Sequence, residues 1–187
     1  MDAADNGTLT LDGIAAAVAS GVDVNGKRCG DTALHCAVVR KRRELVAALL
    51  AAGADANVKS DYHDRTSVWR GAVNSTADIL QLLIDGGGSV NEADSHVESP
   101  LIALVRNNNG DAAARLGVLL AQPELDLDAK YQGRTAEERA VEWRRPELAA
   151  AIAAEVSSLA LYFFPVVRPC ALLLLGVASC WRCPFSA

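Results

Sequence analysis

The sequence predicts an all-α repeat fold, and three observations lead to that prediction. The chain repeats itself: Thr32 and Thr66 lie 34 residues apart, and so do Asn57 and Asn91 near the ends of the same two segments. Within each segment, apolar residues recur at helical spacing. Hydrophobic residues make up 51% of the chain but aromatic residues only 5%. The core must therefore consist of Ala, Leu, Val and Ile, which favours helices over strands.

Residues 28–60 show what each part of the repeat does. The hydroxyl of Thr32 can cap the N-terminus of a first helix. The apolar stripe of this helix consists of Leu34, Ala37 and Val38. A second amphipathic stripe follows and consists of Leu45, Val46, Leu49 and Leu50. Gly53 then ends the second helix in a left-handed conformation, and residues 55–57 start a turn.

Further copies of this pattern divide the chain. Complete repeats are predicted over about residues 28–60, 61–94, 95–130 and 131–158, after a partial repeat over about residues 1–27. Pro100 lies just inside the first helix of the third complete repeat, where a missing N–H costs nothing. In the last repeat, Glu137, Glu138 and Arg139 suit a polar terminal cap.

These phrases resemble those of the ankyrin-repeat family. Residues 32–37, Thr-Ala-Leu-His-Cys-Ala, resemble its T-P-L-H-x-A signature, and residues 49–57 resemble its L-L-x-x-G-A-D-x-N ending. The resemblance implies an ankyrin-repeat solenoid of stacked antiparallel helix pairs with projecting β-turn fingers. It also implies a non-catalytic module that binds proteins, an adaptor, scaffold or regulatory subunit. The His35 imidazole is expected to hydrogen-bond backbone between adjacent repeats.

Later repeats depart from the signature. Trp69, Ile102 and Glu138 stand where the signature has histidine, and the loop at residues 107–111 is about two residues longer than its counterparts. Local packing in these repeats is therefore expected to differ from that in residues 28–60.

In ankyrin-repeat proteins, partners usually lie in the concave groove formed by the fingers and the first helices. Carried over by repeat position, the predicted contact residues are Arg28, Asp31, Val39, Arg40, Tyr62, His63, Arg65, Val73, Asn74, His96, Glu98, Arg106, Asn107, Tyr131, Gln132, Arg134, Glu142 and Trp143. Tyr, Trp and Arg are enriched at binding hot spots. Because this set leans basic, we expect an acidic protein or peptide partner. We also expect the module to be a monomer. Trp143 could instead pack against the C-terminal tail.

The sequence predicts no catalytic, cofactor or metal site. Histidine occurs only at positions 35, 63 and 96, and none is paired with an evident nucleophile. Gly86–Gly88 lacks the strand and lysine of a phosphate loop, so we interpret it as a helix stop. Cys180 and Cys183 form a lone C-x-x-C without a second ligand pair.

Charge and cysteine usage limit the setting. A formal net charge of −5 argues against sequence-independent nucleic-acid binding. Residues 40–43, Arg-Lys-Arg-Arg, could meet an acidic partner or direct nuclear import, but a solvated loop between helices is favoured. Five unevenly placed cysteines do not form a disulfide framework, and the first residues lack a signal-peptide pattern. We therefore expect a cytoplasmic protein, with nuclear or membrane-attached forms as alternatives.

Residues 159–187 form a hydrophobic tail in which only Arg168 and Arg182 are charged. Three alternatives stay open: an unstructured extension, a segment folded onto the last repeat, or a tail anchor that tethers a partner at a cytosolic membrane surface. Pro165, Arg168 and Pro169 argue against an uninterrupted spanning helix. A tail without Asp, Glu, His or Lys cannot supply an active site.

Overall fold

The computed structural model describes residues 13, 20–107 and 109–163, with side chains to residue 157. The described ranges contain eight α-helices longer than a turn: α3 (Ala33–Val39), α4 (Arg43–Ala51), α5 (Ser67–Asn74), α6 (Ala77–Asp85), α7 (Pro100–Asn107), α8 (Ala112–Leu120), α9 (Ala136–Glu142) and α10 (Pro146–Phe163). The predicted all-α repeat fold is confirmed.

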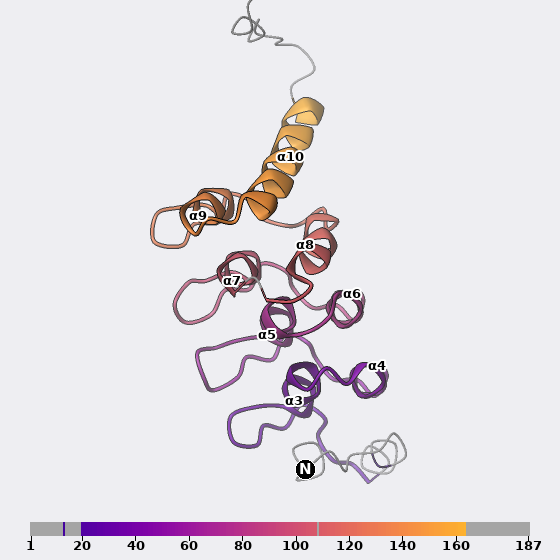
Figure 1. Cartoon of the computed structure of the whole chain (residues 1–187). Helices are drawn as coiled ribbons and strands as arrows, with labels where there is room; N and C mark the ends of the chain where they lie inside the picture. The colour runs from indigo at the N-terminus through magenta and orange to yellow at the C-terminus, as the bar shows by residue number, and fades with distance from the viewer. Residues whose placement is uncertain (1–12, 14–19, 108, 164–187) are drawn as a thin grey trace, which may run out of the picture.

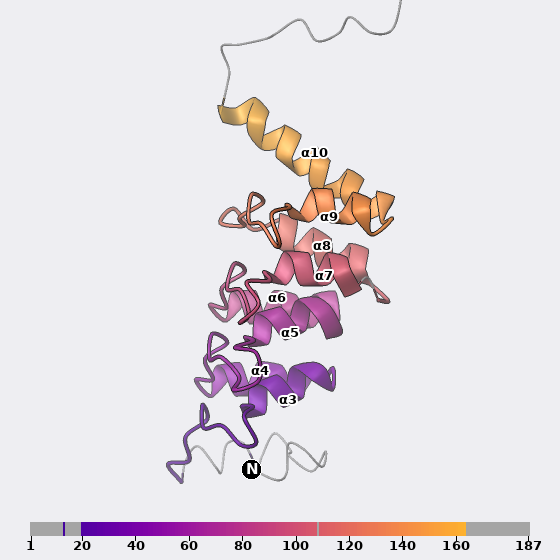
Figure 2. The same ribbon diagram turned by 90° about the vertical axis from the view of Figure 1, so that its left-hand side faces the viewer.

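The helices stack as four pairs. The first helices, α3, α5, α7 and α9, form one row, and the second helices, α4, α6, α8 and α10, form the other (Figure 1). Before each first helix the chain projects sideways as a finger, and all four fingers leave the stack on the same side (Figures 1 and 2). The result is a solenoid in which each repeat packs on its neighbours.

Threonine hydroxyls start three of the first helices, as predicted. The hydroxyl oxygens of Thr32, Thr66 and Thr135 accept hydrogen bonds from backbone N–H groups three residues later, at 3.3, 3.2 and 3.4 Å. At Thr32 and Thr135 the third residue, His35 or Glu138, also accepts from the threonine N–H, which completes a capping box. These bonds satisfy donors that a helix N-terminus leaves unpaired.

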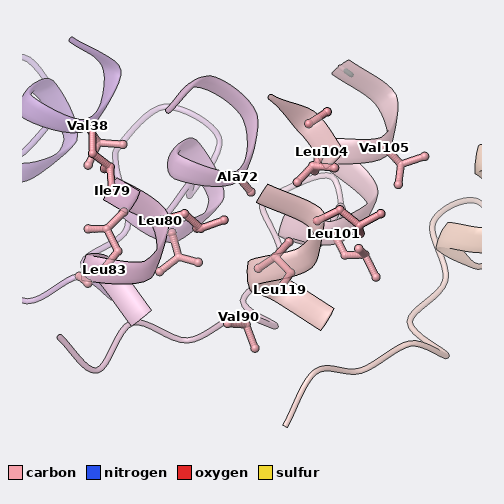
Figure 3. Packing of buried hydrophobic residues seen from close by; sticks show 14 of the residues in the cluster. Val38, Ala72, Ile79, Leu80, Leu83, Val90, Leu101, Leu104, Val105 and Leu119 are labelled. Atoms are coloured by element: carbon pink, nitrogen blue, oxygen red, sulfur yellow. The ribbon is translucent and has the colours of Figure 1, made fainter. Parts of the chain in front are cut away.

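One aliphatic core runs through the stack. Both predicted stripes of the first complete repeat contribute to it, and equivalent leucines, isoleucines and valines continue it to Ile152. Figure 3 shows Ile79, Leu80 and Leu83 of α6 on one side of Ala72, with Leu101 and Leu119 on the other. Small side chains such as Ala72 let neighbouring helices approach closely, so repeats join without a gap.

The lengthened loop before α8 is held by a buried arginine that the sequence did not identify. Arg115 is 2% exposed. Its guanidinium donates to the backbone oxygen of Val73 at 2.6 Å, and to both the backbone oxygen and the Oδ1 of Asn109. Val73 lies at the end of α5, where carbonyl groups lack helical partners. Burial lowers the pKa of Arg115, and these acceptors compensate its charge.

The ends of the chain are only partly covered. Most of the predicted partial repeat at residues 1–27 lies outside the described residues, as do Arg168, Cys180 and Cys183 of the tail. α10 continues to Phe163, beyond the repeat boundary predicted at residue 158. Among the described helices, none combines the length and the apolar character needed to cross a bilayer.

Candidate partner-binding surface

Two of the fingers end in tight two-residue turns. At the tips, Cys29 and Gly30 have φ of 50° and 82°, and Gln132 and Gly133 have φ of 50° and 79°. Left-handed conformation at both central residues is the signature of a type I′ hairpin turn. The flanking residues of the first finger, Arg28 and Asp31, exchange backbone hydrogen bonds of 2.8 and 3.1 Å. These tips are therefore fixed backbone structures.

Backbone hydrogen bonds also join the first three fingers to one another. The N–H of Asp61 donates to the carbonyl of Gly30, and the N–H of Ser95 donates to the carbonyl of His63, both at 2.8 Å. Exposed ion pairs between Lys27 and Asp61 (2.7 Å) and between Lys59 and Glu92 (2.8 Å) run alongside. Exposed pairs contribute little energy each, so the backbone bonds carry most of this alignment.

The first helices contact the next finger through ring nitrogens. The Nε2 of His35 lies 3.1 Å from the carbonyl oxygen of Arg65, which confirms the role implied for this imidazole. Burial lowers the pKa of His35 to about 4, so the ring is neutral at pH 7. In the next repeat, the indole Nε1 of Trp69 donates to the carbonyl of Glu98 at 3.0 Å. Tryptophan thus replaces the signature histidine with the same contact.

A second row of contacts comes from asparagines at the ends of the repeats. Asn57 donates to the carbonyl of Gly87 at 2.9 Å and accepts from the N–H of Ser89 at 2.7 Å. Asn91 forms the same pair of bonds to the following repeat, at 2.6 and 2.9 Å. Asn25 forms the pair less tightly, at 3.5 and 2.8 Å. Each amide therefore fixes the distance between successive repeats.

The predicted contact residues differ in accessibility. Exposed members are Arg28, Val39, Arg40, Tyr62, His63, His96, Arg106, Asn107, Gln132, Arg134 and Glu142. Half-buried members are Asp31, Arg65, Asn74, Tyr131 and Trp143. Trp143 packs beside the apolar core and near the Arg139 guanidinium, 5.5 Å from its ring centroid. It is therefore not an open anchor.

Two predicted contact residues, Val73 and Glu98, are buried, and their assignment to the exposed surface is corrected here. Val73 is 6% exposed because it packs in a small cluster with Trp69 and Ala103. Glu98 is 1% exposed. Its Oε2 lies 2.9 Å from the Arg106 guanidinium, but neither carboxylate oxygen has an aligned hydrogen-bond donor among the described residues. Burial raises the pKa of Glu98, against the opposing effect of Arg106.

Carboxylates balance much of the positive charge along this surface. Arg70, which the sequence did not single out, makes a two-pronged contact with Asp31 at 3.0 and 2.5 Å. Arg65 lies 3.4 Å from Asp94, and its guanidinium stacks 4.0 Å from the centre of the Trp69 ring. No sequence pattern marks these pairs, because partners from different repeats meet only in the stack. The surface is mixed in charge rather than uniformly basic.

Exposed apolar side chains stand among these charges. The largest exposures on the fingers belong to Tyr62, at 60%, and Val97, at 68%. The Tyr62 ring crosses to the preceding finger and lies over Gly30, where an added Cβ would come within 2.8 Å of it. We define the finger surface as Tyr62, Val97 and the arginines Arg65 and Arg106.

Comparison with known proteins identifies the repeats. The sequence model of the ankyrin repeat matches residues 29–61. The chain is 30% identical over 131 residues, 64% of its length, to Protein lin-12 of Caenorhabditis elegans. It is 35% identical over 71 residues, 37% of its length, to E3 ubiquitin-protein ligase KEG of Arabidopsis thaliana. These matches span only 9% and 4% of the two relatives. Together with the stacked helix pairs and fingers, these matches show that the chain contains ankyrin repeats.

Proposed function

We propose that the chain is a non-catalytic adaptor or scaffold whose partner binds along the finger surface. The observation that carries this proposal is the exposure of Tyr62 and Val97 on neighbouring fingers. An exposed tyrosine near arginines resembles the composition of interface hot spots, and Val97 adds apolar area beside it. Ankyrin repeats generally mediate protein–protein interaction, and the proposal assigns that role to particular residues.

The fixed backbone of the fingers supports this assignment. The bonds from Asp61 to Gly30 and from Ser95 to His63 hold the tips in place. Binding to a surface that is already ordered loses less conformational entropy than binding that must order a loop. The fingers can therefore give useful affinity from a modest contact area.

The expectation of an acidic partner leads to a more specific proposal about which arginines meet its acidic group. Arg106 has a side chain that is 40% exposed, and Arg65 one that is 27% exposed, although each already faces a carboxylate. An acidic group of the partner would meet the outward side of these guanidiniums, which can serve several acceptors at once. We propose a partner segment that combines an apolar residue for Tyr62 and Val97 with a carboxylate for Arg65 or Arg106.

Site-specific photo-crosslinking of the full chain tests this proposal. A photoreactive phenylalanine analogue replaces Tyr62 in one protein and Val156 in another. Val156 is a matched control because it is an exposed apolar residue of α10, away from the fingers. We expect one protein to crosslink from position 62, and Val97→Ser to reduce that product about tenfold. Equal products from both positions, or a product that Val97→Ser leaves unchanged, would contradict the finger surface.

The apolar composition of residues 159–187 motivates a second proposal, that the chain tethers its partner at a cytosolic membrane surface. Carbonate extraction of cells that express the full chain or residues 1–163 tests it. A tethered protein stays with the membranes only in its full-length form. If both forms are extracted, the tethering proposal fails and the finger-surface proposal is unaffected.

A further inference from the structure

Two histidines of neighbouring fingers meet in the stack. The Nε2 of His96 lies 3.1 Å from the Nδ1 of His63, and the ring centroids are 5.1 Å apart at a tilt of 39°. The residues are 33 positions apart, one repeat length. Each lies three residues before the residue that immediately precedes the first helix of its repeat, Thr66 before α5 and Ser99 before α7. Both side chains are exposed, so a solute can reach them.

The backbone holds these imidazoles in position. The N–H of Ser95 donates to the carbonyl of His63 at 2.8 Å, which joins the two tips beside the rings. The N–H groups of His96 and Glu98 both donate to the Oδ1 of Asp94, at 2.9 and 3.1 Å, and this carboxylate orders the third finger, which carries His96. Because the backbone is fixed here, the relative position of the two ring nitrogens changes only by rotation of the histidine side chains.

The separation of the nitrogens suits a metal ion. Imidazole nitrogens bind Zn²⁺ at about 2.0–2.1 Å, so two nitrogens on one tetrahedral ion are about 3.3 Å apart. The observed 3.1 Å is close to that value. In the metal-free pair, one nitrogen must carry a proton and the other accept it. A bound ion uses both lone pairs, so the ring that carried the shared proton changes tautomer and holds that proton on its other nitrogen.

We propose that His63 and His96 form a two-histidine site for a divalent transition-metal ion, of the class that prefers imidazole ligands, such as Zn²⁺ or Ni²⁺. The ion bridges the second and third complete repeats at their finger tips. No described group of three or more His, Cys, Asp or Glu residues could hold a metal. The remaining coordination positions are therefore filled by water or by a donor from another molecule.

Titration calorimetry of the full-length chain with Ni²⁺ tests the site. Ni²⁺ is the probe because thiolates compete more strongly for Zn²⁺, and the chain has five cysteines. Three variants are compared with the unmodified protein: His63→Ala, His96→Ala and the double variant. Val97→Ala is the matched control, since Val97 adjoins His96 on the same finger and its side chain cannot coordinate a metal ion.

We expect one Ni²⁺ phase in the unmodified protein that each single histidine variant weakens on the order of tenfold or more. The double variant should lose little beyond the single variants, because both rings are needed for chelation. Val97→Ala should bind Ni²⁺ as the unmodified protein does. Binding that survives in the double variant, or two independent partial losses, would overturn the proposal.

A second measurement separates loss of ligands from loss of folding. Thermal unfolding in excess EDTA should be the same for all variants, and added Ni²⁺ should raise the melting temperature only where both histidines are present. If a single alanine variant unfolds early in EDTA, His63→Gln and His96→Gln replace it, because glutamine restores polar contacts without an imidazole. A melting temperature that Ni²⁺ raises equally in every variant would also overturn the site.

Discussion

The first and third junctions between the complete repeats solve the same packing problem with different residues. At the first, the His35 ring reaches the carbonyl of Arg65 in the next finger. At the third, Ile102 occupies the histidine position and has no polar atom to offer. A different bond links these two repeats, at the C-terminal end of α7: the Arg145 guanidinium donates to the carbonyl of Arg106 at 2.8 Å.

The second junction is intermediate, with Trp69 as donor to Glu98. The last finger is held from within its own repeat, where buried Arg139 donates to the carbonyls of Tyr131 and Gln132. Close apolar contact is common to all three junctions, whereas the polar connection to the finger is made by His35, by Trp69 or, for the last finger, by Arg139 of its own repeat. Substitutions at the three junctions test this distinction.

The largest effect is expected at the second junction. Trp69→Ala removes a side chain that is 3% exposed and leaves a cavity beside Val73 and Ala103, which should lower the free energy of unfolding by about 3–5 kcal/mol. Trp69→Phe keeps most of the packing but loses the N–H, so its effect should be about 1 kcal/mol. Urea unfolding followed by circular dichroism measures both. If the two variants were equally unstable, apolar contact would not be the main requirement.

The His35 contact at the first junction should depend on pH, because the imidazole titrates near neutral pH and the Trp69 indole at the second junction does not. The pKa of His35 is 6.5 in the unfolded chain and about 4 when buried. Between these values the unfolded chain binds more protons, so the contribution of His35 is complete above pH 6.5 and is lost as pH falls toward 4. The free energy of unfolding should fall by up to about 3 kcal/mol over this range.

Paired urea titrations of the unmodified protein and His35→Gln from pH 7 to pH 4 measure this dependence. Glutamine can still donate to the Arg65 carbonyl but does not titrate. The difference between the two proteins isolates His35, because Glu98 is common to both. The raised pKa of Glu98 acts in the opposite direction, with stability present at low pH and lost as pH rises. Parallel curves for the two proteins would show that His35 is not buried as a neutral ring.

Smaller losses of stability are expected for the asparagines at the ends of the repeats. Asn57→Ala removes two bonds of 2.9 and 2.7 Å to the next repeat and should cost about 1–2 kcal/mol of unfolding free energy. Asn25→Ala should cost less, because its bond to the Gly53 carbonyl is 3.5 Å long. Urea unfolding of both variants gives the order. The reverse order would mean that the first repeat boundary is held more tightly than its geometry indicates.

Equivalent positions in the repeat show where sequence reasoning holds. Helix starts at Thr32, Thr66 and Thr135 follow from local chemistry, because a cap needs only the residues of one turn. The His35 contact follows from the family signature, which encodes a neighbouring repeat. Both predictions are confirmed in the structure.

Burial at the groove could not be predicted in the same way. Val39 and Val73 occupy the same repeat position, yet Val39 is 43% exposed and Val73 only 6%. The difference arises one turn earlier, where Trp69 replaces the smaller His35 and joins Ala103 in covering Val73. The buried Glu98 and Arg115 likewise meet partners from other segments, the Arg106 guanidinium and the backbone carbonyl of Val73. A single repeat does not contain that information.

The smallest change in unfolding free energy is expected when the signature imidazole is introduced at the third junction. Ile102→His places an imidazole at the signature position, with the carbonyl of Arg134 as the equivalent of those of Arg65 and Glu98. The new hydrogen bond should offset most of the apolar burial lost with Ile102, so unfolding free energy should change by less than about 1 kcal/mol. Urea unfolding at pH 7.5 measures it, with Ile102→Ala as the cavity control at about 2–5 kcal/mol. A loss as large as that of the control would mean that the carbonyl of Arg134 lies too far from α7 for this contact.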